Sequence, residues 1–445
     1  MDCLRQQESG HGESSCGHAG VIGAGIAGLA ASIALRRAGW AVEVFERSHF
    51  KNEVGAAITM TANAALVLDR WGFDKEKAMA MPNGSVVVRL ATDPSVVLRR
   101  QDYSDGDGVL QYGIWSFHRV DLHSELRNIA MAPSSDAVPA APVQIRLGCK
   151  IEGLDCDSGA IRLANGETIQ KDLVVVADVA GHPCEARRNG RSIYRWLVPM
   201  DTVMADPELG SVYSREQSGF VGWLDSSTQT FWASYVCRGG QVLNIALVHD
   251  TQPGRGDNEV WHSQVPKEEV LSVARNFHPS IQKMIFMPTE DGIHVHHAKT
   301  RPPLDSFVRG RTVAVGDAAH VMMPSHAAAA GIAIESAASL EVLFREVDGK
   351  DCPTVRYRLQ LFDKLRIPRC NLTMLVSNSP MGQPREPGVV EEIRRFYQGP
   401  LPPFDAPAYS KPWRDLLFGH DEFRAAEQLL ADEGLINVKN ASCMT

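Results

Sequence analysis

The sequence predicts an α/β fold that is interrupted by an antiparallel sheet and completed by a helical C-terminal segment. A glycine-rich turn at residues 23–28 stands between a short apolar strand and an amphipathic helix. Two short apolar runs, 173–176 and 313–315, are typical of parallel strands with both faces buried. Between them, residues 190–290 contain strand-like pieces separated by Gly- and Asp-rich turns. The chain of 445 residues is long enough for two intertwined domains with a cleft.

Composition narrows the class of protein and partner. Apolar residues make up 44% and charged residues 22%, as in globular proteins, and no stretch of about 18 apolar residues predicts a membrane span. A net charge of -8 without a dense Lys/Arg run argues against nucleic acid. The nine cysteines never form a CxxC pair, which disfavours a disulfide framework or zinc site. We therefore expect a cytoplasmic monomer or homodimer, without stable membrane insertion, that binds a small molecule.

The N-terminal region predicts a β-α-β unit. Residues 1–17 are polar and lack the apolar core of a signal peptide, so we interpret them as a flexible lead-in. A strand at 18–22 leads into the glycines, a helix covers 29–38, and a second strand follows at 41–46.

The later elements divide the chain further. Before the insertion, the patterns predict helices at 62–71 and 121–130 and a strand at 85–90. A Pro- and Ala-rich loop is expected at 132–142. Within the insertion, the patterns predict strands at 192–198, 231–236 and 242–248. After the insertion, they predict helices within 333–380 and at 421–431. We expect a discontinuous cofactor domain made of residues 18–188 and 290–380. An antiparallel-sheet substrate domain is expected at 189–289, and a Pro-rich helical segment at 381–445.

The three glycines of the first turn have the spacing of a dinucleotide-binding motif. Gly23 permits a tight turn, Gly25 lets the backbone approach a pyrophosphate, and Gly28 allows the helix to pack closely on the strand. The helix N-terminus adds N–H donors and partial positive charge. Glu46 ends the second strand, where an acid binds ribose hydroxyls, and we place Arg47 at the same site. The pattern predicts a Rossmann-like unit but does not separate FAD from NAD.

A second motif follows the strand at 313–315. Gly316 and Asp317 end that strand, and Pro324 precedes a helix expected at 331–340. An aspartate there can hydrogen-bond a polyol chain, while the helix N-terminus faces an electron-rich ring. With the N-terminal unit, this arrangement resembles the group A flavin monooxygenases, the family of para-hydroxybenzoate hydroxylase and salicylate hydroxylase. The resemblance implies that the Rossmann-like domain binds FAD.

The resemblance also implies roles for individual residues. Segment 117–123 is similar to the family's His-Arg-x-Asp-Leu segment, and segment 53–58 is similar to its flavin-contacting loop. The implied FAD contacts are Ala57, Arg119, Asp178, Gly316, Asp317, Pro324, Ala330 and Gly331. Segments 194–199 and 235–238 resemble strands of salicylate-hydroxylase-like enzymes and dearomatising polyketide hydroxylases. This likeness implies that Arg195 holds a substrate phenolate or carboxylate and that Tyr235 orients the ring.

Two segments depart from the family pattern. The family's middle motif is Asp-Gly and serves both FAD and NAD(P)H, whereas here Asp178 is followed by Val179 and the glycine is displaced to Gly181. A β-branched valine does not readily adopt positive φ. The family's Gly-x-Gly loop is replaced by alanines at 327–330, which add methyl groups where the backbone lies against the flavin. Both changes could alter flavin movement or its reduction.

The resemblance implies an FAD-dependent, NAD(P)H-consuming monooxygenase, a hydroxylase of secondary metabolism. Such enzymes insert one oxygen atom from O2 into a small aromatic or polyketide-like substrate through a flavin C4a-hydroperoxide. Epoxidation and Baeyer–Villiger insertion remain open as outcomes. The alanine loop and Val179 also leave open a non-redox cyclisation or isomerisation, and a ligand carrier without activity is a third class. His296, His297 and His320 have no acidic or cysteine partners at ligand spacing, so no metal site is expected.

Overall fold

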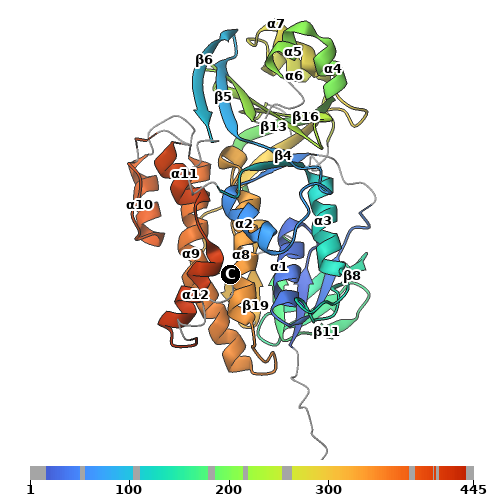
Figure 1. Cartoon of the computed structure of the whole chain (residues 1–445), viewed down its shortest axis with the longest axis vertical. Helices are drawn as coiled ribbons and strands as arrows, with labels where there is room; N and C mark the ends of the chain where they lie inside the picture. The colour runs from blue at the N-terminus through green and yellow to red at the C-terminus, as the bar shows by residue number, and fades with distance from the viewer. Residues whose placement is uncertain are drawn as a thin grey trace, which may run out of the picture.

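The structure is a computed structural model, and two sheets joined by helices organise it (Figure 1). The residues that it describes are 17–50, 56–103, 111–178, 186–213, 219–252, 263–379, 386–403, 405–406 and 410–436. Val179, Gly181, residues 53–55 and nearly all of the predicted lead-in lie outside them.

The first sheet is the predicted Rossmann-like one. Its strands lie in the order β18-β19-β12-β1-β2-β8, and all neighbouring pairs are parallel except β18 with β19. Their bounds are β1 His18–Ile22, β2 Ala41–Glu46, β8 Gln144–Leu147, β12 Leu173–Val176, β18 Val308–Arg309 and β19 Thr312–Ala314. Helix α1 (Ile26–Arg37) connects β1 to β2, so the predicted β-α-β unit is confirmed.

Alternation along the strands gives this sheet two different coverings. Val21 and Val175 belong to the large core that includes α1 and α8 (Ala329–Phe344). Ile22 and Val174 belong to a smaller core shared with a three-stranded sheet, β9 (Ile151–Asp155), β10 (Ala160–Leu163) and β11 (Thr168–Gln170). Both faces are therefore buried, which explains the continuous apolar runs in the sequence.

The second sheet has seven strands in the order β17-β13-β16-β15-β14-β5-β6. Their bounds are β5 Ser85–Leu90, β6 Asp93–Asp102, β13 Arg187–Pro199, β14 Phe220–Asp225, β15 Thr230–Cys237, β16 Val242–Asp250 and β17 His294–Thr300. The inserted antiparallel sheet is thus present, but it is larger than the 189–289 segment. Strands β5 and β6, which the sequence interpretation assigned to the cofactor domain, join it because β5 pairs with β14 in parallel. Strand β17 joins it from the other side.

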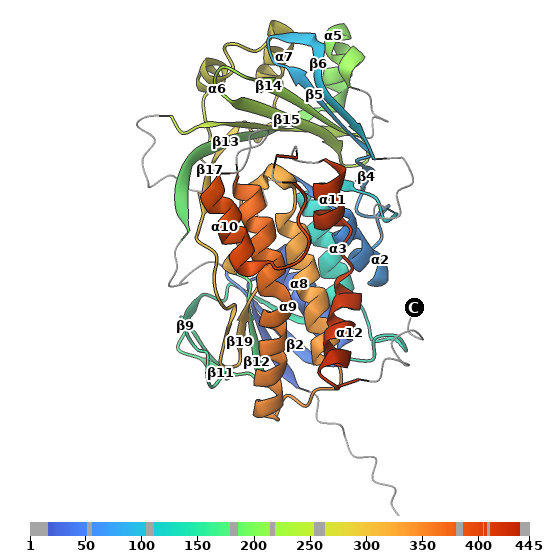
Figure 2. The same cartoon turned by 90° about the vertical axis from the view of Figure 1, so that its left-hand side faces the viewer.

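One face of the seven-stranded sheet packs on a set of short helices, and the other faces the first domain (Figure 2). The short helices are α4 (Met200–Ala205), α5 (Pro207–Val212), α6 (Lys267–Val273) and α7 (Pro279–Gln282). Trp196, Trp223 and Trp232 lie in this core and are almost fully buried. The core fixes that face of the sheet, so alternate residues along each strand point to the opposite side.

Helices connect the two sheets. A small sheet consists of β3 (Ala57–Met60), β4 (Met81–Pro82) and β7 (Trp115–His118). Helix α2 (Ala62–Arg70) follows β3 in the chain, and α3 (Arg119–Met131) follows β7. The C-terminal part consists of α9 (Cys352–Asn378), α10 (Pro387–Phe396), α11 (Lys411–Phe418) and α12 (Glu422–Asp432). Helices α9 and α12 pack on α8, and α10 packs on α9 (Figure 2). None of the described helices has both the length and the apolar character that crossing a membrane requires.

Candidate active site

A cavity of about 1160 Å³ lies between the parallel sheet and the seven-stranded sheet. It exceeds the range of roughly 300–1,000 Å³ that is typical of sites for one drug-sized ligand. The predicted site residues that line it are Gly25, Ala57, Arg119, Arg195, Tyr235, Gly316, Asp317, Pro324 and Ala330. Gly23, Gly28, Glu46, Arg47, Asp178 and Gly331 are not among its lining residues. The cavity therefore brings together both substrate residues and the flavin-side residues.

The glycine turn leaves room and donors for a pyrophosphate. Gly23 has φ +96, and a Cβ on Gly28 would lie 1.9 Å from the Gly23 carbonyl oxygen, so both positions require glycine. A Cβ on Gly25 would meet no described atom within 4 Å, because this glycine faces open space. Gly25 is also the N-cap of α1 and supplies no side-chain cap, so the first N–H groups of the helix remain available to an anion.

The carboxyl ends of β2 and β12 lie beside this turn. One carboxylate oxygen of Glu46 accepts a hydrogen bond from the Ala24 N–H at 2.7 Å, and the other accepts one from the Ser48 N–H at 2.7 Å. A carboxylate has about four acceptor sites, so Glu46 can still accept ribose hydroxyls. Arg47 lies 3.7 Å from Asp178, between its Nε and Oδ2 atoms, which joins the ends of the two strands. Ligands of open α/β sheets bind at this edge.

Asp317 and Arg119 meet at the next part of the cavity. Gly316 has φ +61, and a Cβ there would lie 2.6 Å from the Ala27 Cβ, so β19 ends directly against the first turn of α1. The Asp317 side chain is open to the cavity, yet protein surrounds it, and this burial raises its pKa. The charges of Arg301 and Arg119 oppose that rise. Arg119 is held at the start of α3 by a 2.8 Å bond from its N–H to the Ala56 carbonyl.

The alanine loop lies between Pro324 and helix α8. Pro324 begins a short 3-10 turn, and Ala327 then adopts the left-handed conformation with φ 52. Alanine therefore occupies a backbone position that favours glycine. Ala330 lines the cavity, whereas a Cβ on Gly331 would lie 2.7 Å from the Thr61 hydroxyl. The structure thus places Gly331 at the contact between α8 and the start of α2, where Thr61 and Ala330 line the cavity but Gly331 does not.

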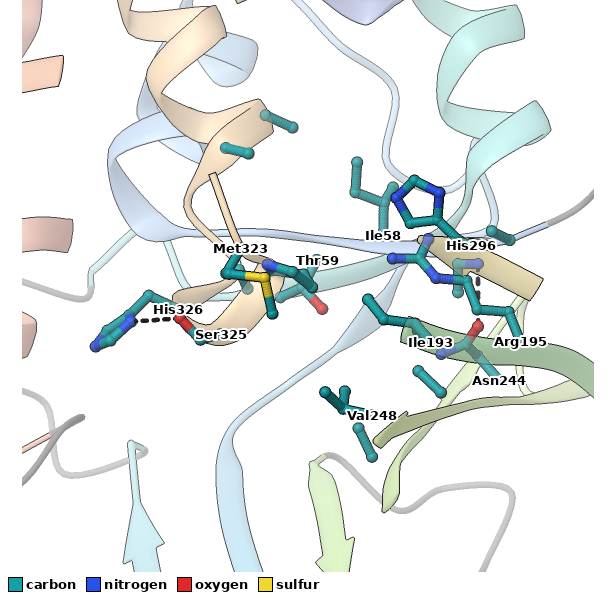
Figure 3. A pocket seen from close by; sticks show the side chains of 18 of the residues that line it. Ile58, Thr59, Ile193, Arg195, Asn244, Val248, His296, Met323, Ser325 and His326 are labelled. Carbon is teal, nitrogen blue, oxygen red and sulfur yellow. Dashed lines mark hydrogen bonds between the residues drawn. The ribbon is translucent and has the colours of Figure 1, made fainter. Parts of the chain in front are cut away.

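The two predicted substrate residues lie on the sheet side of the cavity (Figure 3). Arg195 extends from β13 into the cavity, and its buried Nε has no hydrogen-bond partner among the described residues. Burial lowers the Arg195 pKa, and the neighbouring Tyr235 opposes that effect. Burial also raises the pKa of Tyr235, whose hydroxyl hydrogen-bonds with Thr59. Tyr235 is therefore a neutral donor or acceptor near pH 7, facing a fixed positive charge.

Three further residues line the cavity; Asn244 and Thr59 were not predicted from the sequence, whereas His296 was expected as polar lining or core. Asn244 lies beside Tyr235 in the register of β15 and β16, and its Oδ1 accepts a hydrogen bond from the Ala57 N–H at 3.2 Å. Thr59 contacts the Tyr235 hydroxyl, and His296 lies opposite Ile193 on the neighbouring strand. All three line the cavity. The alternation of 244, 246 and 248 with buried neighbours was visible in the sequence, but the strand order that brings Asn244 next to Tyr235 was not.

His297 and His320 do not line the cavity. His297 bonds with Ser192 through Nδ1 at 2.7 Å, and His320 is buried in the core, where burial lowers its pKa to about 3. One group of described residues, Glu335, His420 and Glu422, has the spacing of metal ligands. However, Arg366 forms ion pairs with both carboxylates, so the arginine already occupies the position of a cation.

Comparison with known proteins identifies the same unit and the same architecture. Residues 21–59 match the model of the NAD(P)-binding Rossmann-like domain. The chain is 28% identical to hispidin-3-hydroxylase of Neonothopanus nambi over 446 aligned positions, covering 95% of this chain and 97% of that protein. It is 29% identical to the FAD-dependent monooxygenase cfoG of Aspergillus candidus over 377 positions, covering 81% and 84%.

Solved structures share the fold over nearly the whole chain. The structure of CtdE in complex with FAD and a substrate superposes with a TM-score of 0.73 at 18% identity, covering 94% of this chain and 98% of that one. A salicylate hydroxylase substrate complex gives a TM-score of 0.68 at 19% identity, with the same coverage. The fold and site define the class of two-domain flavoprotein oxidoreductases. In sequence the chain is similar to FAD-dependent monooxygenases and hydroxylases along most of its length, and in fold it is similar to a salicylate hydroxylase.

Proposed function

We propose that the protein is an FAD-dependent, NAD(P)H-consuming monooxygenase that adds one oxygen atom from O2 to an aromatic or polyketide-like substrate. The observation that carries this proposal is that one cavity runs from the glycine turn to the buried Nε atom of Arg195, which has no hydrogen-bond partner among the described residues. Relatives along almost the entire chain are named FAD-dependent monooxygenases or hydroxylases, which supports the same activity.

The donor set fits FAD. Gly25 and the first N–H groups of α1 would hold the pyrophosphate, and Glu46 would accept the ribose hydroxyls. Asp317 would accept hydrogen bonds from the ribityl chain, while Pro324 and Ala330 would lie against the ring system. When bound and reduced by NAD(P)H, the flavin supplies the reaction with O2. Because Asp317 is surrounded by protein, hydroxyl donors from a ligand would stabilise its charged form.

The chain's own residues position and charge the substrate. The Arg195 guanidinium would pair with a phenolate or carboxylate, and its positive charge favours the ionised, electron-rich form of a phenol. Tyr235 would hydrogen-bond the same molecule from the neighbouring side of the pocket, fixing the orientation of its ring. The apolar sheet face around them would exclude water from the reacting atoms.

The proposal is tested with purified protein reconstituted with FAD. We expect oxidation of NADPH or NADH to accelerate when a phenol from a panel is added, with one labelled atom entering the product under 18O2. Product of unchanged oxidation state formed anaerobically without nicotinamide would instead support the non-redox cyclase or isomerase. Protein that takes up no FAD would support the ligand carrier.

We also propose that the protein acts in the cytoplasm as a monomer or homodimer. This proposal is supported by the scattered cysteines, of which those in the described residues are free thiols. Sedimentation of the FAD-loaded protein measures its oligomeric state directly.

A further inference from the structure

A row of small residues crosses the cavity face of the seven-stranded sheet and ends at Arg195. The strand registers place Arg195 opposite Ala246, Ala246 opposite Ala233, and Ala233 opposite Gly222. Arg195, Ala246 and Ala233 line the cavity. The four positions therefore form the floor of one trough that runs across four neighbouring strands.

Larger side chains stand on both sides of this floor. The row before it contains Tyr235 and Asn244, which are paired across β15 and β16. The row after it contains Phe231, Val248 and Ile193, which are paired across β15, β16 and β13. All of them line the cavity, and Figure 3 shows Asn244, Val248, Ile193 and Arg195 along this face. The wall after the floor is therefore apolar, whereas the wall before it carries the polar groups of Tyr235 and Asn244 between Leu197 and Phe220.

Two aromatic rings close the far end of the trough. Phe220 and Phe231 stack with their ring centroids 6.0 Å apart and their planes 15° apart. A Cβ on Gly222 would lie 2.6 Å from the tip of the Phe231 ring and 3.1 Å from the Phe220 ring. The two rings thus lie over Gly222, and the absence of a side chain there is what admits them.

The other end of the trough carries the guanidinium of Arg195. The Nε atom of Arg195 is buried and has no partner among the described residues, which is costly unless a ligand completes it. A row of small residues alone defines no site, but this guanidinium adds an independent polar feature that points to an anionic group. The trough is therefore polar at Arg195 and aromatic at Phe220 and Phe231.

The length of the trough separates single-ring from two-ring ligands. Neighbouring strands lie roughly 4.8 Å apart, so the two steps from Arg195 to Ala233 span roughly 10 Å between Cα atoms. The Phe220 and Phe231 rings occupy the space over the next position, Gly222. A single substituted benzene ring held at Arg195 leaves Ala246 or Ala233 uncovered. Because Ala246 and Ala233 have small side chains, the trough has space for a flat group. A larger side chain at either position would fill that space.

We infer that the substrate is an elongated, planar compound of two linked rings. Its anionic group pairs with Arg195, and its second, uncharged ring lies on Ala246 and Ala233 and stops at Phe220 and Phe231. This inference rests on the proposed function, because it concerns the substrate site of the same enzyme. It makes Ala246 and Ala233 residues that determine substrate length.

The test measures ligand binding to the oxidised FAD-loaded protein without nicotinamide. The probes are 4-hydroxybenzoate, with one ring, and 4'-hydroxystilbene-4-carboxylate, with two linked rings, and binding is followed by the change in flavin absorbance. We expect the two-ring probe to bind at least about 100-fold more tightly than the one-ring probe. A246V and A233V should each weaken the two-ring probe at least about tenfold and change the one-ring probe less than about twofold.

The matched control is A137V, a change of the same size in the exposed loop, which should alter neither probe. Thermal melting and flavin content establish that each variant is folded. Equal binding of both probes to the natural protein, failure of both to bind, or equal weakening of both by A246V and A233V overturns the inference. If the length preference is found but NADPH never reduces the flavin, the proposed function fails and the inference about the trough stands. If turnover occurs with one-ring phenols and no length preference is found, only the inference fails.

Discussion

At the scale of single residues, the site depends on charged groups that protein surrounds and that a ligand can complete. The buried Nε of Arg195 has no hydrogen-bond partner among the described residues, and burial raises the pKa of Asp317 against the opposing charges of Arg301 and Arg119. Each charge is costly in the ligand-free protein and becomes favourable when a ligand of opposite or hydrogen-bonding character arrives. Such groups are typical of binding sites, where stability and function conflict.

Replacing Arg195 with Met should weaken binding of a carboxylate probe such as 4-hydroxybenzoate by about 10- to 150-fold. The variant loses a charge-assisted hydrogen bond, which is worth about 1.5–3 kcal/mol. Titration of the FAD-loaded protein by flavin absorbance measures the effect. R309M removes an exposed arginine of β18 and should leave binding unchanged. Equal affinity of R195M and the natural protein would place the anion elsewhere.

Replacing Asp317 with Asn should stabilise the FAD-free protein near neutral pH while weakening FAD binding. Burial raises the folded-state pKa of Asp317 above its usual value of 3.8. The ionised carboxyl therefore lowers stability as pH rises through that raised pKa, and this loss disappears below pH 3.8. Melting of both proteins between pH 4 and 8 should show D317N ahead at neutral pH, with the difference shrinking towards pH 4. An unchanged FAD affinity would contradict the assigned role.

At the scale of elements, the β1-α1 turn separates a glycine needed for folding from one needed for the cofactor. A methyl group on Gly28 would collide with the Gly23 carbonyl at 1.9 Å, so G28A should destabilise the FAD-free protein by about 1–3 kcal/mol or more. A methyl group on Gly25 meets no described atom within 4 Å, so G25A should melt like the natural protein. G25A should still lose FAD affinity at least about tenfold, because the methyl group enters the pyrophosphate site. Melting of the FAD-free proteins and fluorescence titration with FAD give the two readouts. A stable G28A, or a G25A that binds FAD normally, would contradict this division.

Sequence patterns predicted the elements whose signals are local. Strands β1 and β2 and helix α1 follow from apolar periodicity and the glycine spacing, and the structure confirms them. The membership of β5 in the seven-stranded sheet was missed because its partner β14 lies far along the chain, and no local pattern specifies a parallel pairing at that distance. For the same reason the family motif pointed to Arg195 and Tyr235, whereas Asn244 becomes their neighbour only through cross-strand register. The predicted flavin contact of Gly331 stays a prediction, and the structure adds that a side chain there would meet the Thr61 hydroxyl.

At the scale of the whole molecule, a buried ion network ties the C-terminal helices to the domain that carries the cavity. Arg366 on α9 pairs with Glu335 on α8 at 2.9 Å and also with Glu422 on α12, and all three side chains are fully buried. Arg369 pairs with Glu335 at 2.8 Å. Helix α8 begins beside the alanine loop, and its first residues line the cavity. The ion network therefore fixes the position of a helix that forms part of the cavity wall.

Replacing Arg366 with Met should lower the free energy of unfolding by about 3–5 kcal/mol, because it removes the one arginine that pairs with both buried carboxylates, Glu335 and Glu422. Urea denaturation of the FAD-loaded protein measures the loss. R395M removes an exposed ion pair with Asp305 and should cost no more than about 1 kcal/mol. Equal midpoints for R366M and R395M would show that the network contributes little.

The central claim is that the cavity joining the two sheets holds FAD where a reductant and an anionic aromatic substrate can act on it. The most direct measurement records the visible absorbance of the purified protein after reconstitution with FAD and follows it during anaerobic addition of NADPH or NADH. We expect a yellow protein whose flavin absorbance bleaches slowly with one of the nicotinamides and faster when an anionic phenol is present. A colourless protein, or a bound flavin that neither nicotinamide reduces with any phenol of the panel, would contradict the account.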